Sequence, residues 1–166
     1  MGFEIERKFL VRGDGWRKAV SDSMRICQGY LNDEQRCSVR IRISGERAWL
    51  NIKSATIGAR RHEYEYEIPV ADGESMLAEL SCKPLIEKVR YFVPVADRVW
   101  EVDVFEGENA GLVVAELELD HPEEPFELPE WAGEEVTHDA RYYNTCLSMR
   151  PFNRWSQEER YPASRE

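Results

Sequence analysis

The stretch FEIERKF, residues 3–9, alternates apolar and charged side chains at every second position. A period of two indicates a β-strand whose two faces meet different surroundings. The charged face of this strand carries Glu4, Glu6 and Lys8, so two carboxylates and an ammonium group lie in a row. The other face is apolar and must be buried against the rest of the protein.

Six later segments repeat this alternation and set bulky apolar or aromatic side chains against charges. Their charged faces carry Arg40 and Arg42 (37–44), Lys53 (47–54), Glu63, Glu65 and Glu67 (60–69), Lys88 and Arg90 (86–95), Glu101 and Asp103 (98–106), and Glu116, Glu118 and Asp120 (112–120). The first two of these segments and the fourth contribute bases to the charged face, and the others contribute acids. A solvated surface usually mixes signs within a strand, so this segregation predicts a basic wall that faces an acidic wall.

Such a pair of walls suits a metal–polyphosphate complex. Arginine makes forked hydrogen bonds to phosphate oxygens, and lysine acts as a point charge. Hard cations such as Mg²⁺ take carboxylate oxygens together with waters and substrate phosphates. We therefore predict a metal-dependent site for a polyphosphate group. The alternative is an open sheet whose charged face lies in bulk water, which would leave the role of these charges unknown.

Strands 3–11 and 25–31 complete a set of eight, with tight turns expected at Ser44-Gly45-Glu46 and Ala96-Asp97-Arg98. Short connections make neighbouring strands antiparallel. Helices are expected over 14–22, over 73–82 with Asp72 as its cap, and from about 137 to 149. These elements predict an α+β fold: closing the eight antiparallel strands into a barrel with the helices on its flanks would turn the charges toward its interior, whereas an open sheet would leave them in bulk water.

Composition limits the other possibilities. The 166 residues suffice for one core, which we place in a single domain over 1–155 followed by a polar tail over 156–166. The net charge of −10 argues against nucleic-acid binding. Four cysteines without CxxC spacing favour a reduced, cytoplasmic setting, and the chain has no apolar run that could span a membrane. The acidic stretch Glu123–Glu135 is expected to be a solvated loop.

The ordered set of alternating pairs resembles the CYTH superfamily, the triphosphate tunnel metalloenzymes. It begins with the ExExK motif at residues 4–8 and continues through RIR (40–42), IK (52–53), EYE (63–65), KVR (88–90), EVD (101–103) and ELE (116–118). The likeness runs from Gly2 to about Phe152. It implies an eight-stranded tunnel that binds a triphosphate through basic residues and one or two divalent metals, Mg²⁺ or Mn²⁺. Small bacterial proteins of this kind are most often inorganic triphosphatases.

Carried over to this chain, the resemblance assigns roles to individual residues. It implies substrate binding by Lys8, Arg40, Arg42, Lys53, Lys88, Arg90 and Arg141, the last on a C-terminal helix that closes the tunnel. It implies metal binding by Glu4, Glu6, Glu63, Glu65, Asp103, Glu116 and Glu118, with Glu4, Glu6, Lys8 and Glu118 catalytic. The substrate is then a small-molecule triphosphate, most simply inorganic triphosphate cleaved to pyrophosphate and phosphate.

Other functions remain open at this stage. A class IV-type adenylate cyclase or a thiamine triphosphatase would use the same interior on an organic triphosphate, although the sequence holds no dedicated adenine-binding motif. A non-enzymatic polyphosphate binder would need the basic wall alone. Outward aromatic side chains such as Tyr64, Tyr66 and Trp100 are compatible with a homodimer.

Overall fold

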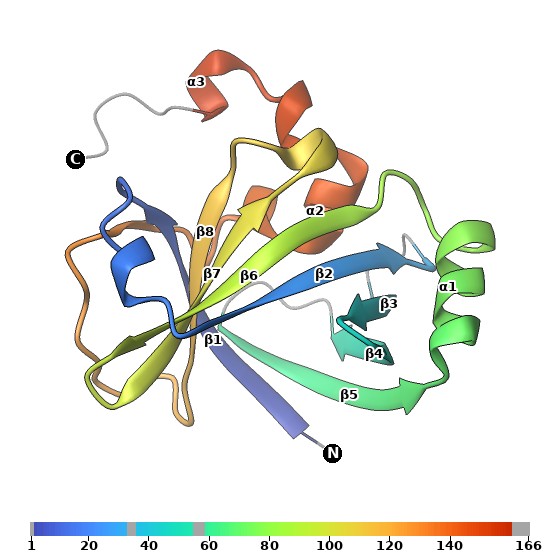
Figure 1. Ribbon diagram of the computed structural model, residues 1–166, viewed down its shortest axis with the longest axis horizontal. Coiled ribbons are helices and arrows are strands. Elements are labelled where there is room, and N and C mark those ends of the chain that lie inside the picture. The colour runs from blue at the N-terminus through green and yellow to red at the C-terminus, as the bar shows by residue number, and fades with distance from the viewer. Residues whose placement is uncertain (1, 33–35, 55–58, 161–166) are drawn as a thin grey trace.

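The interior of this protein is enclosed by a β-barrel in the computed structural model, which describes residues 2–32, 36–54 and 59–160 (Figure 1). The strands are β1 (Gly2–Val11), β2 (Asp22–Tyr30), β3 (Cys37–Ser44), β4 (Arg47–Ser54), β5 (Arg60–Ile68), β6 (Ile86–Val95), β7 (Arg98–Phe105), β8 (Val113–Glu118) and the short β9 (Ala132–Glu135). Neighbours pair in the order β5-β4-β3-β2-β6-β7-β8-β1, and a further β5–β1 pairing closes the ring. All these pairs are antiparallel, so the predicted eight-stranded barrel is confirmed.

Strand β1 closes the barrel because it is long enough to pair with two partners along one edge. Its first residues pair with β5, where Glu4 lies opposite Arg61, and its last residues pair with β9. Its other edge pairs with β8, where Glu6 faces Glu118 and Lys8 faces Glu116. Directly paired residues of antiparallel strands share a face of the sheet. The register therefore brings the charged faces together inside the barrel.

Both predicted hairpin turns are present. Gly45 and Ala96 have φ values of 58° and 56°, the left-handed region that two-residue hairpin turns require. Glycine adopts this conformation without steric cost, whereas Ala96 is a non-glycine residue at positive φ. The two turns fix the β3–β4 and β6–β7 registers, on which the cross-strand neighbours of the interior charges depend.

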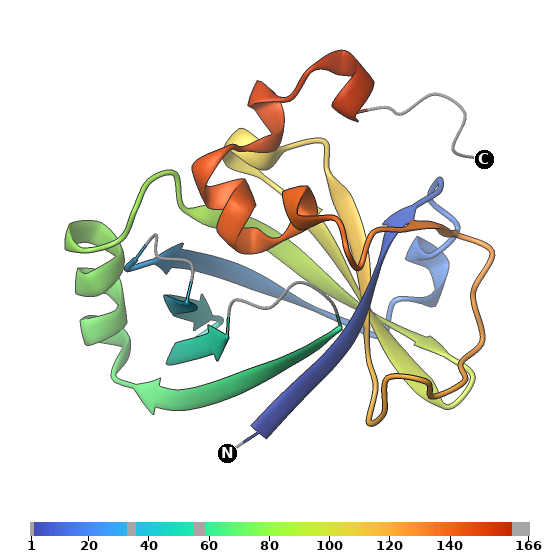
Figure 2. The same cartoon turned by 180° about the vertical axis from the view of Figure 1, so that it is seen from behind.

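The outer surface of the barrel is covered at two places. Helix α1 (Val70–Glu79) lies over β3 and β4 (Figures 1 and 2), and a Cβ on Gly73 would come within 3.0 Å of Ala48. The helix was expected from residue 73 with a cap at Asp72. It begins three residues earlier, directly after Pro69, and Asp72 lies within its first turn, where a carboxylate stabilises the helix dipole.

A cluster of buried apolar side chains covers the opposite flank, outside β6, β7, β8 and β1. It contains Trp16 and Trp100, against which Phe126 and Trp131 pack. The helix expected over 14–22 is reduced to one 3₁₀ turn, η1 (Arg17–Ala19), because β2 already begins at Asp22. The expectation of a solvated loop over Glu123–Glu135 is wrong in part, since these two aromatic rings and β9 anchor that segment to the barrel.

The C-terminal segment covers one end of the barrel (Figures 1 and 2). It consists of η3 (Ala140–Tyr142), α2 (Asn144–Met149), η4 (Phe152–Arg154) and α3 (Gln157–Arg160), and η4 contacts η2 (Gly107–Asn109), the turn between β7 and β8. At this end the interior side chains are apolar, and Ile86, Phe105 and Val114 form one buried cluster with Leu147 and Trp155. Charged side chains line the remaining length of the interior.

The single helix expected over 137–149 is divided at Tyr143, whose ψ of 141° is extended rather than helical. The polar tail expected from residue 156 begins as α3, where the Glu159 carboxylate accepts hydrogen bonds from Arg150 at 2.6 and 2.7 Å. Residues 161–166 lie outside the described part of the chain. Within that part, the helices are too short and too polar to cross a membrane.

Candidate functional site

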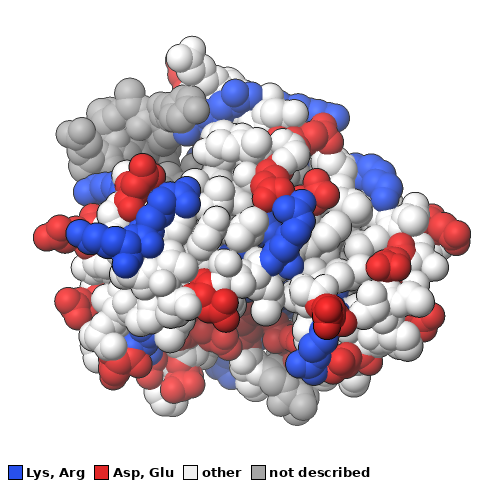
Figure 3. Space-filling view, viewed as in Figure 1, with Lys and Arg blue, Asp and Glu red and all other residues white. Residues whose placement is uncertain are grey.

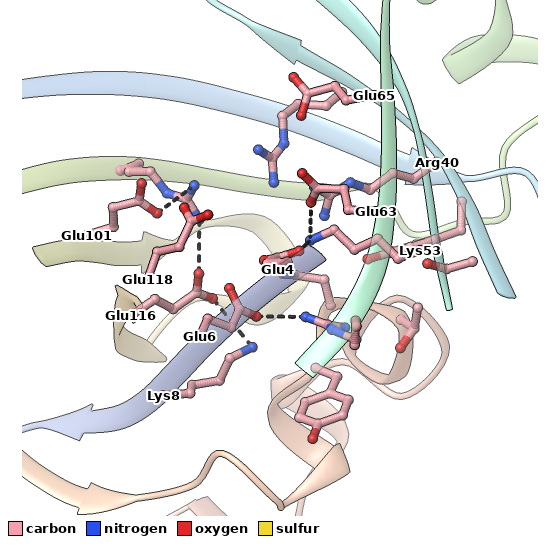
Figure 4. A pocket seen from close by; sticks show the side chains of 18 residues that line it. Glu4, Glu6, Lys8, Arg40, Lys53, Glu63, Glu65, Glu101, Glu116 and Glu118 are labelled. Carbon is pink, nitrogen blue, oxygen red and sulfur yellow. Dashed lines mark hydrogen bonds and ion pairs between the residues drawn. The ribbon is translucent and has the colours of Figure 1, made fainter. Parts of the chain in front are cut away.

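A cavity of about 170 Å³ lies inside the barrel. Figure 4 shows Glu101, Glu116 and Glu118 pointing into it from one side and Arg40 and Lys53 from the other. The full lining is Glu4, Glu6, Lys8, Tyr30, Ser38, Arg40, Arg42, Lys53, Arg61, Glu63, Glu65, Arg90, Glu101, Glu116, Glu118, Tyr143, Asn144 and Thr145. Nearly all of these side chains are charged or polar, so the cavity is built for an ionic ligand.

The charges in the cavity are sorted by strand. We call Glu101, Glu116, Glu118, Glu4, Glu6, Glu63 and Glu65 the acidic arc; they stand on the adjacent strands β7, β8, β1 and β5. We call Arg90, Arg42, Arg40 and Lys53 the basic arc; they stand on β6, β3 and β4, with the neutral β2 between β6 and β3. On the outer face seen in Figure 3, by contrast, acidic and basic side chains are intermixed. Among the described residues that line the cavity, Lys8 and Arg61 are the bases that stand on these four acidic strands.

The acidic arc crowds carboxylates together in a buried space. Glu6 faces Glu118 across β1 and β8, and Glu101 faces Glu116 across β7 and β8. Burial, together with the neighbouring carboxylates of Glu116 and Glu4, raises the pKa of Glu6 to about 7. Burial and neighbouring acids also raise the pKa values of Glu101 and Glu118. This arc therefore favours any cation that enters it.

Part of this negative charge is balanced by cations that reach into the arc. The Lys53 ammonium lies 2.6 Å from Glu4 and 3.3 Å from Glu63, and Arg61 lies 2.7 Å from Glu6. Lys8 lies 3.4 Å from Glu116, and its ammonium is 5.2 Å from the centre of the Tyr143 ring. The same ring lies 5.6 Å from the guanidinium of Arg61. Tyr143 thus contacts the only two bases that stand among the acids of this lining.

The two arginines of β3 form no ion pair with any described residue. Arg40 is 4% exposed, and its Nε has no hydrogen-bond partner in the described part of the chain. Arg42 donates from Nε to the side-chain oxygen of Gln28 at 2.9 Å. Burial, Arg40 and Arg90 lower the pKa of Arg42 to about 9. One buried and one half-buried guanidinium group without a carboxylate partner are costly unless an anion binds them, which indicates a polyanion site.

The cations of β6 are neutralised instead. Asp103 accepts hydrogen bonds from Lys88 at 2.7 Å and from Arg90 at 2.8 and 2.9 Å. Burial lowers the pKa of Lys88 to about 8, against the attraction of Asp103. Burial opposes ionisation of Asp103, but Arg90 and Lys88 outweigh it and hold its pKa below the usual value. Lys88 and Asp103 are fully buried and lie behind the lining, where they support Arg90.

The structure brings most of the predicted site residues into one cavity. Those that line it are Glu4, Glu6, Lys8, Arg40, Arg42, Lys53, Glu63, Glu65, Arg90, Glu116 and Glu118. Lys88 and Asp103, predicted to bind substrate and metal, lie behind this lining, and a further exception among the predicted substrate-binding residues is Arg141. Its guanidinium contacts Asp139 at 2.6 Å and lies over the Trp155 ring, outside the cavity lining. The Arg141 guanidinium, which was expected to bind a substrate phosphate, thus binds the Asp139 carboxylate instead.

Sequence reasoning missed several lining residues. Arg61 has the same strand parity as Glu63, so the period-two pattern held the signal that would have found it. Glu101 was placed on a charged face but not assigned to the site. Tyr30 and Ser38 are isolated polar residues on β2 and β3 without a charge pattern. Tyr143, which directly precedes α2, and Asn144 and Thr145 in its first turn also line the cavity, and the local sequence carries no signal of this contact.

The donor set of the acidic arc fits a hard divalent cation. Its ligands are carboxylate oxygens, which Mg²⁺ and Mn²⁺ prefer, and no imidazole or thiol lines the cavity. In the described residues no three acids already converge on one point, because Glu4, Glu6 and Glu116 are turned toward Lys53, Arg61 and Lys8. Side-chain rotations that exchange these cations for a metal would leave the strands unchanged.

Fold and site together define a class of protein, a closed β-barrel that takes a polyanion and a divalent cation into its interior. The chain belongs to the CYTH domain family, which it matches over residues 2–143. Membership of this family of triphosphate tunnel metalloenzymes implies a divalent metal.

Curated relatives cover nearly the whole chain. An inorganic triphosphatase of Acetivibrio thermocellus is 43% identical over 157 residues, which span 95% of this chain and 100% of the relative. An inorganic triphosphatase of Nitrosomonas europaea is 38% identical over 152 residues, which span 88% of this chain and 97% of the relative.

Solved structures agree with this placement. A crystal structure of an inorganic triphosphatase is 34% identical, has a TM-score of 0.64, and is matched over 90% of this chain and 96% of its own. A putative adenylyl cyclase from Hippeastrum, described as having a dominant triphosphatase activity, is 17% identical with a TM-score of 0.58. The match covers 72% of this chain and 81% of that one, and it shows a shared fold alone.

Proposed function

We propose that this protein hydrolyses inorganic triphosphate to pyrophosphate and phosphate with Mg²⁺ or Mn²⁺ as its metal. The observation that carries the proposal is the pair of arginines on β3, Arg40 buried and Arg42 half-buried, which have no carboxylate partner among the described residues and line the same small cavity as a crowded arc of carboxylates. The two inorganic triphosphatases that align with nearly the whole chain support the choice of reaction.

The basic side chains of the cavity bind the substrate, and the acidic side chains bind the metal. Arg40 and Arg42 bind phosphate oxygens and hold the substrate in place, which lowers the entropy cost of reaching the transition state. Lys53 adds positive charge where negative charge develops on the leaving pyrophosphate, whereas Arg90, largely neutralised by Asp103 and Glu101, contributes hydrogen-bond donors to the lining. Lys8, at the end of the cavity near Tyr143, provides a further cation for the phosphate chain.

The acidic arc provides the metal ligands, for which we propose Glu4, Glu6, Glu116 and Glu118, with Glu63 and Glu65 supporting. A divalent cation held there would neutralise part of the phosphate charge and polarise the phosphoryl oxygens as a Lewis acid. Glu6 must lose its proton to act as a ligand, because its pKa in the metal-free cavity is about 7. Asp103 has a different role, since Lys88 and Arg90 occupy both of its oxygens.

The composition of the lining also separates the candidate substrates. A cyclase or a thiamine triphosphatase must accommodate an organic group beside the phosphates, and such groups are usually bound on apolar walls. Among the lining residues, the aromatic side chains are Tyr30 and Tyr143, and the ring of Tyr143 already contacts Lys8 and Arg61. The lining therefore favours a bare phosphate chain.

The test is phosphate release from inorganic triphosphate, thiamine triphosphate and ATP, each with Mg²⁺, with Mn²⁺ and with a chelator, and with cyclic AMP measured for ATP. We expect metal-dependent release that is fastest from inorganic triphosphate. Glu118→Gln should lower kcat by about 1,000-fold, the size expected when electrostatic stabilisation of a transition state is removed. Glu158→Gln, an exposed change on α3, is the matched control. Full activity of Glu118→Gln, or turnover in the chelator, would overturn the proposal.

A further inference from the structure

Arg42 is held in the barrel by a neutral partner. Its Nε donates to the Gln28 side-chain oxygen at 2.9 Å, and Gln28 lies directly opposite it in the β2–β3 pairing. This contact uses one of the five guanidinium donors and leaves the terminal Nη1 and Nη2 groups for another acceptor. No carboxylate of the described residues binds these groups, since Arg42 forms no ion pair there.

Gln28 itself occupies a position where an apolar side chain would be expected. It is fully buried, and its other β-sheet neighbour on the same face is Ile86. Its side-chain nitrogen has no hydrogen-bond partner in the described part of the chain. A buried, unsatisfied amide destabilises a fold, so a leucine of similar size would serve the core better. The hydrogen bond that the Gln28 oxygen accepts from Arg42 offsets part of the cost of burying this amide.

We propose that Gln28 is a positioning residue that orients Arg42 toward the phosphate chain while leaving its positive charge unneutralised. The inference rests on the proposed function, since it assumes that the anion in the cavity is a triphosphate. It extends that function by assigning a role to a residue outside the cavity lining.

The contrast with Arg90 explains why the partner is an amide. Arg90 is held by the carboxylates of Asp103 and Glu101, the second at 2.9 Å, which cancel most of its charge before a ligand arrives. A carboxylate beside Arg42 would hold the guanidinium equally well. It would also repel the phosphate and occupy donors that the phosphate needs. An amide oxygen orients the group without either effect.

Two variants of Gln28 distinguish the orientation of Arg42 from the neutralisation of its charge. Gln28→Leu removes the acceptor and keeps the volume, and Gln28→Glu keeps the acceptor geometry but adds a negative charge. Gln157→Glu on α3 adds the same charge at an exposed site and is the matched control. The readout is the Kd of inorganic triphosphate by calorimetry without divalent metal and with chelator present, so that binding is measured without turnover.

We expect Gln28→Leu to weaken binding about tenfold and Gln28→Glu about a hundredfold, since hydrogen bonds to charged groups are among the stronger ones in proteins. Gln157→Glu should bind as the parent protein does. The melting temperature of Gln28→Leu should stay close to that of the parent, because the unsatisfied amide nitrogen is removed while the Arg42 Nε loses its acceptor. In steady state with metal, the loss should appear in KM, with kcat changed less than about twofold.

Unchanged affinity in both Gln28 variants would overturn the inference, and so would an equal loss in Gln157→Glu. If Gln28→Glu fails to fold, Gln28→Leu still decides the question. Failure of the proposed function is a separate result, because it would appear as a parent protein that binds triphosphate but does not release phosphate from it.

Discussion

Strands β3 and β6 both present two cations to the interior of the barrel, yet their surroundings differ. On β3, the cross-strand neighbours of Arg40 are Tyr30 and Asn51, and those of Arg42 are Gln28 and Trp49, all of them neutral. On β6, Arg90 lies directly opposite Asp103, which also binds Lys88. One pair of cations is left with its charge intact, and the other pair is neutralised within the protein.

The difference indicates two functions for buried cations in one barrel. A buried ion pair holds its groups in place, and breaking it leaves an uncompensated charge. A buried cation without a counter-charge destabilises the fold and stabilises the complex with an anion. We therefore assign structural support of the wall to Lys88 and Asp103, and substrate binding to Arg40 and Arg42.

The largest effect is expected from Asp103→Asn, which leaves Lys88 buried without its counter-charge. We expect unfolding free energy to fall by about 3–5 kcal/mol, measured by urea denaturation. The double variant Asp103→Leu with Lys88→Met removes this ion pair and should recover part of the loss, since Arg90 loses Asp103 but keeps Glu101 at 2.9 Å. A loss below about 1 kcal/mol in Asp103→Asn would remove the distinction between the two strands.

Arg40→Met should behave in the opposite way. The affinity for metal-free inorganic triphosphate should fall about a hundredfold, because a charged contact to phosphate is lost. The unfolding free energy should stay within about 1 kcal/mol of the parent or rise, since no ion pair is broken. Lys18→Met, at an exposed position on η1, controls for the loss of one positive charge. A stability loss as large as that of Asp103→Asn would contradict this assignment of Arg40.

Tyr143 provides a third way to hold cations, through its ring face. Tyr143→Leu should raise KM for triphosphate about fivefold, because cation–π contacts with Lys8 and Arg61 are worth about 1 kcal/mol. Tyr143→Phe keeps the ring and should remain within about twofold of the parent KM. If both variants lose the same affinity, the hydroxyl group, which donates to the Thr137 carbonyl, is the important feature.

The smallest expected effect is the release of a proton when the metal binds. Because burial and neighbouring acids raise the pKa of Glu6 to about 7, this carboxyl is largely protonated at pH 6 without metal, and stability falls as pH rises from about 4.5 to 7. Mg²⁺ or Mn²⁺ binding at pH 6 should release about one proton, measured by calorimetry in buffers of different ionisation enthalpy. Glu6→Gln should abolish this release. Buffer-independent heats in the parent protein would show that Glu6 does not titrate on metal binding.

Alternation in the sequence was enough to predict the strands and most of the charged lining, and the family resemblance predicted that the sheet closes into a barrel. The pattern works because strand parity alone decides which face a side chain occupies once the sheet is closed. It also held the signal for Arg61, which follows the parity of Glu63. The charge sorting into two arcs was predicted strand by strand, and the order of the strands in the barrel turns it into two opposing sides.

The sequence pattern could not predict which side chains contact one another in the folded protein. The neutralisation of Lys88 and Arg90 by Asp103 depends on the β6–β7 register, and the pattern alone placed all three in the site. Arg141 was predicted to bind substrate, but its guanidinium forms an ion pair at 2.6 Å with Asp139, two residues earlier in the chain. The entry of Tyr143 into the cavity depends on how the C-terminal segment packs on the end of the barrel, which no local pattern records.

The most direct measurement is a crystal structure of the protein with inorganic triphosphate. The account predicts phosphate oxygens within hydrogen-bond distance of both Arg40 and Arg42 inside the barrel, with the Lys88–Asp103 pair intact. Triphosphate bound outside the barrel, or bound to Lys88 with Asp103 displaced, would contradict it.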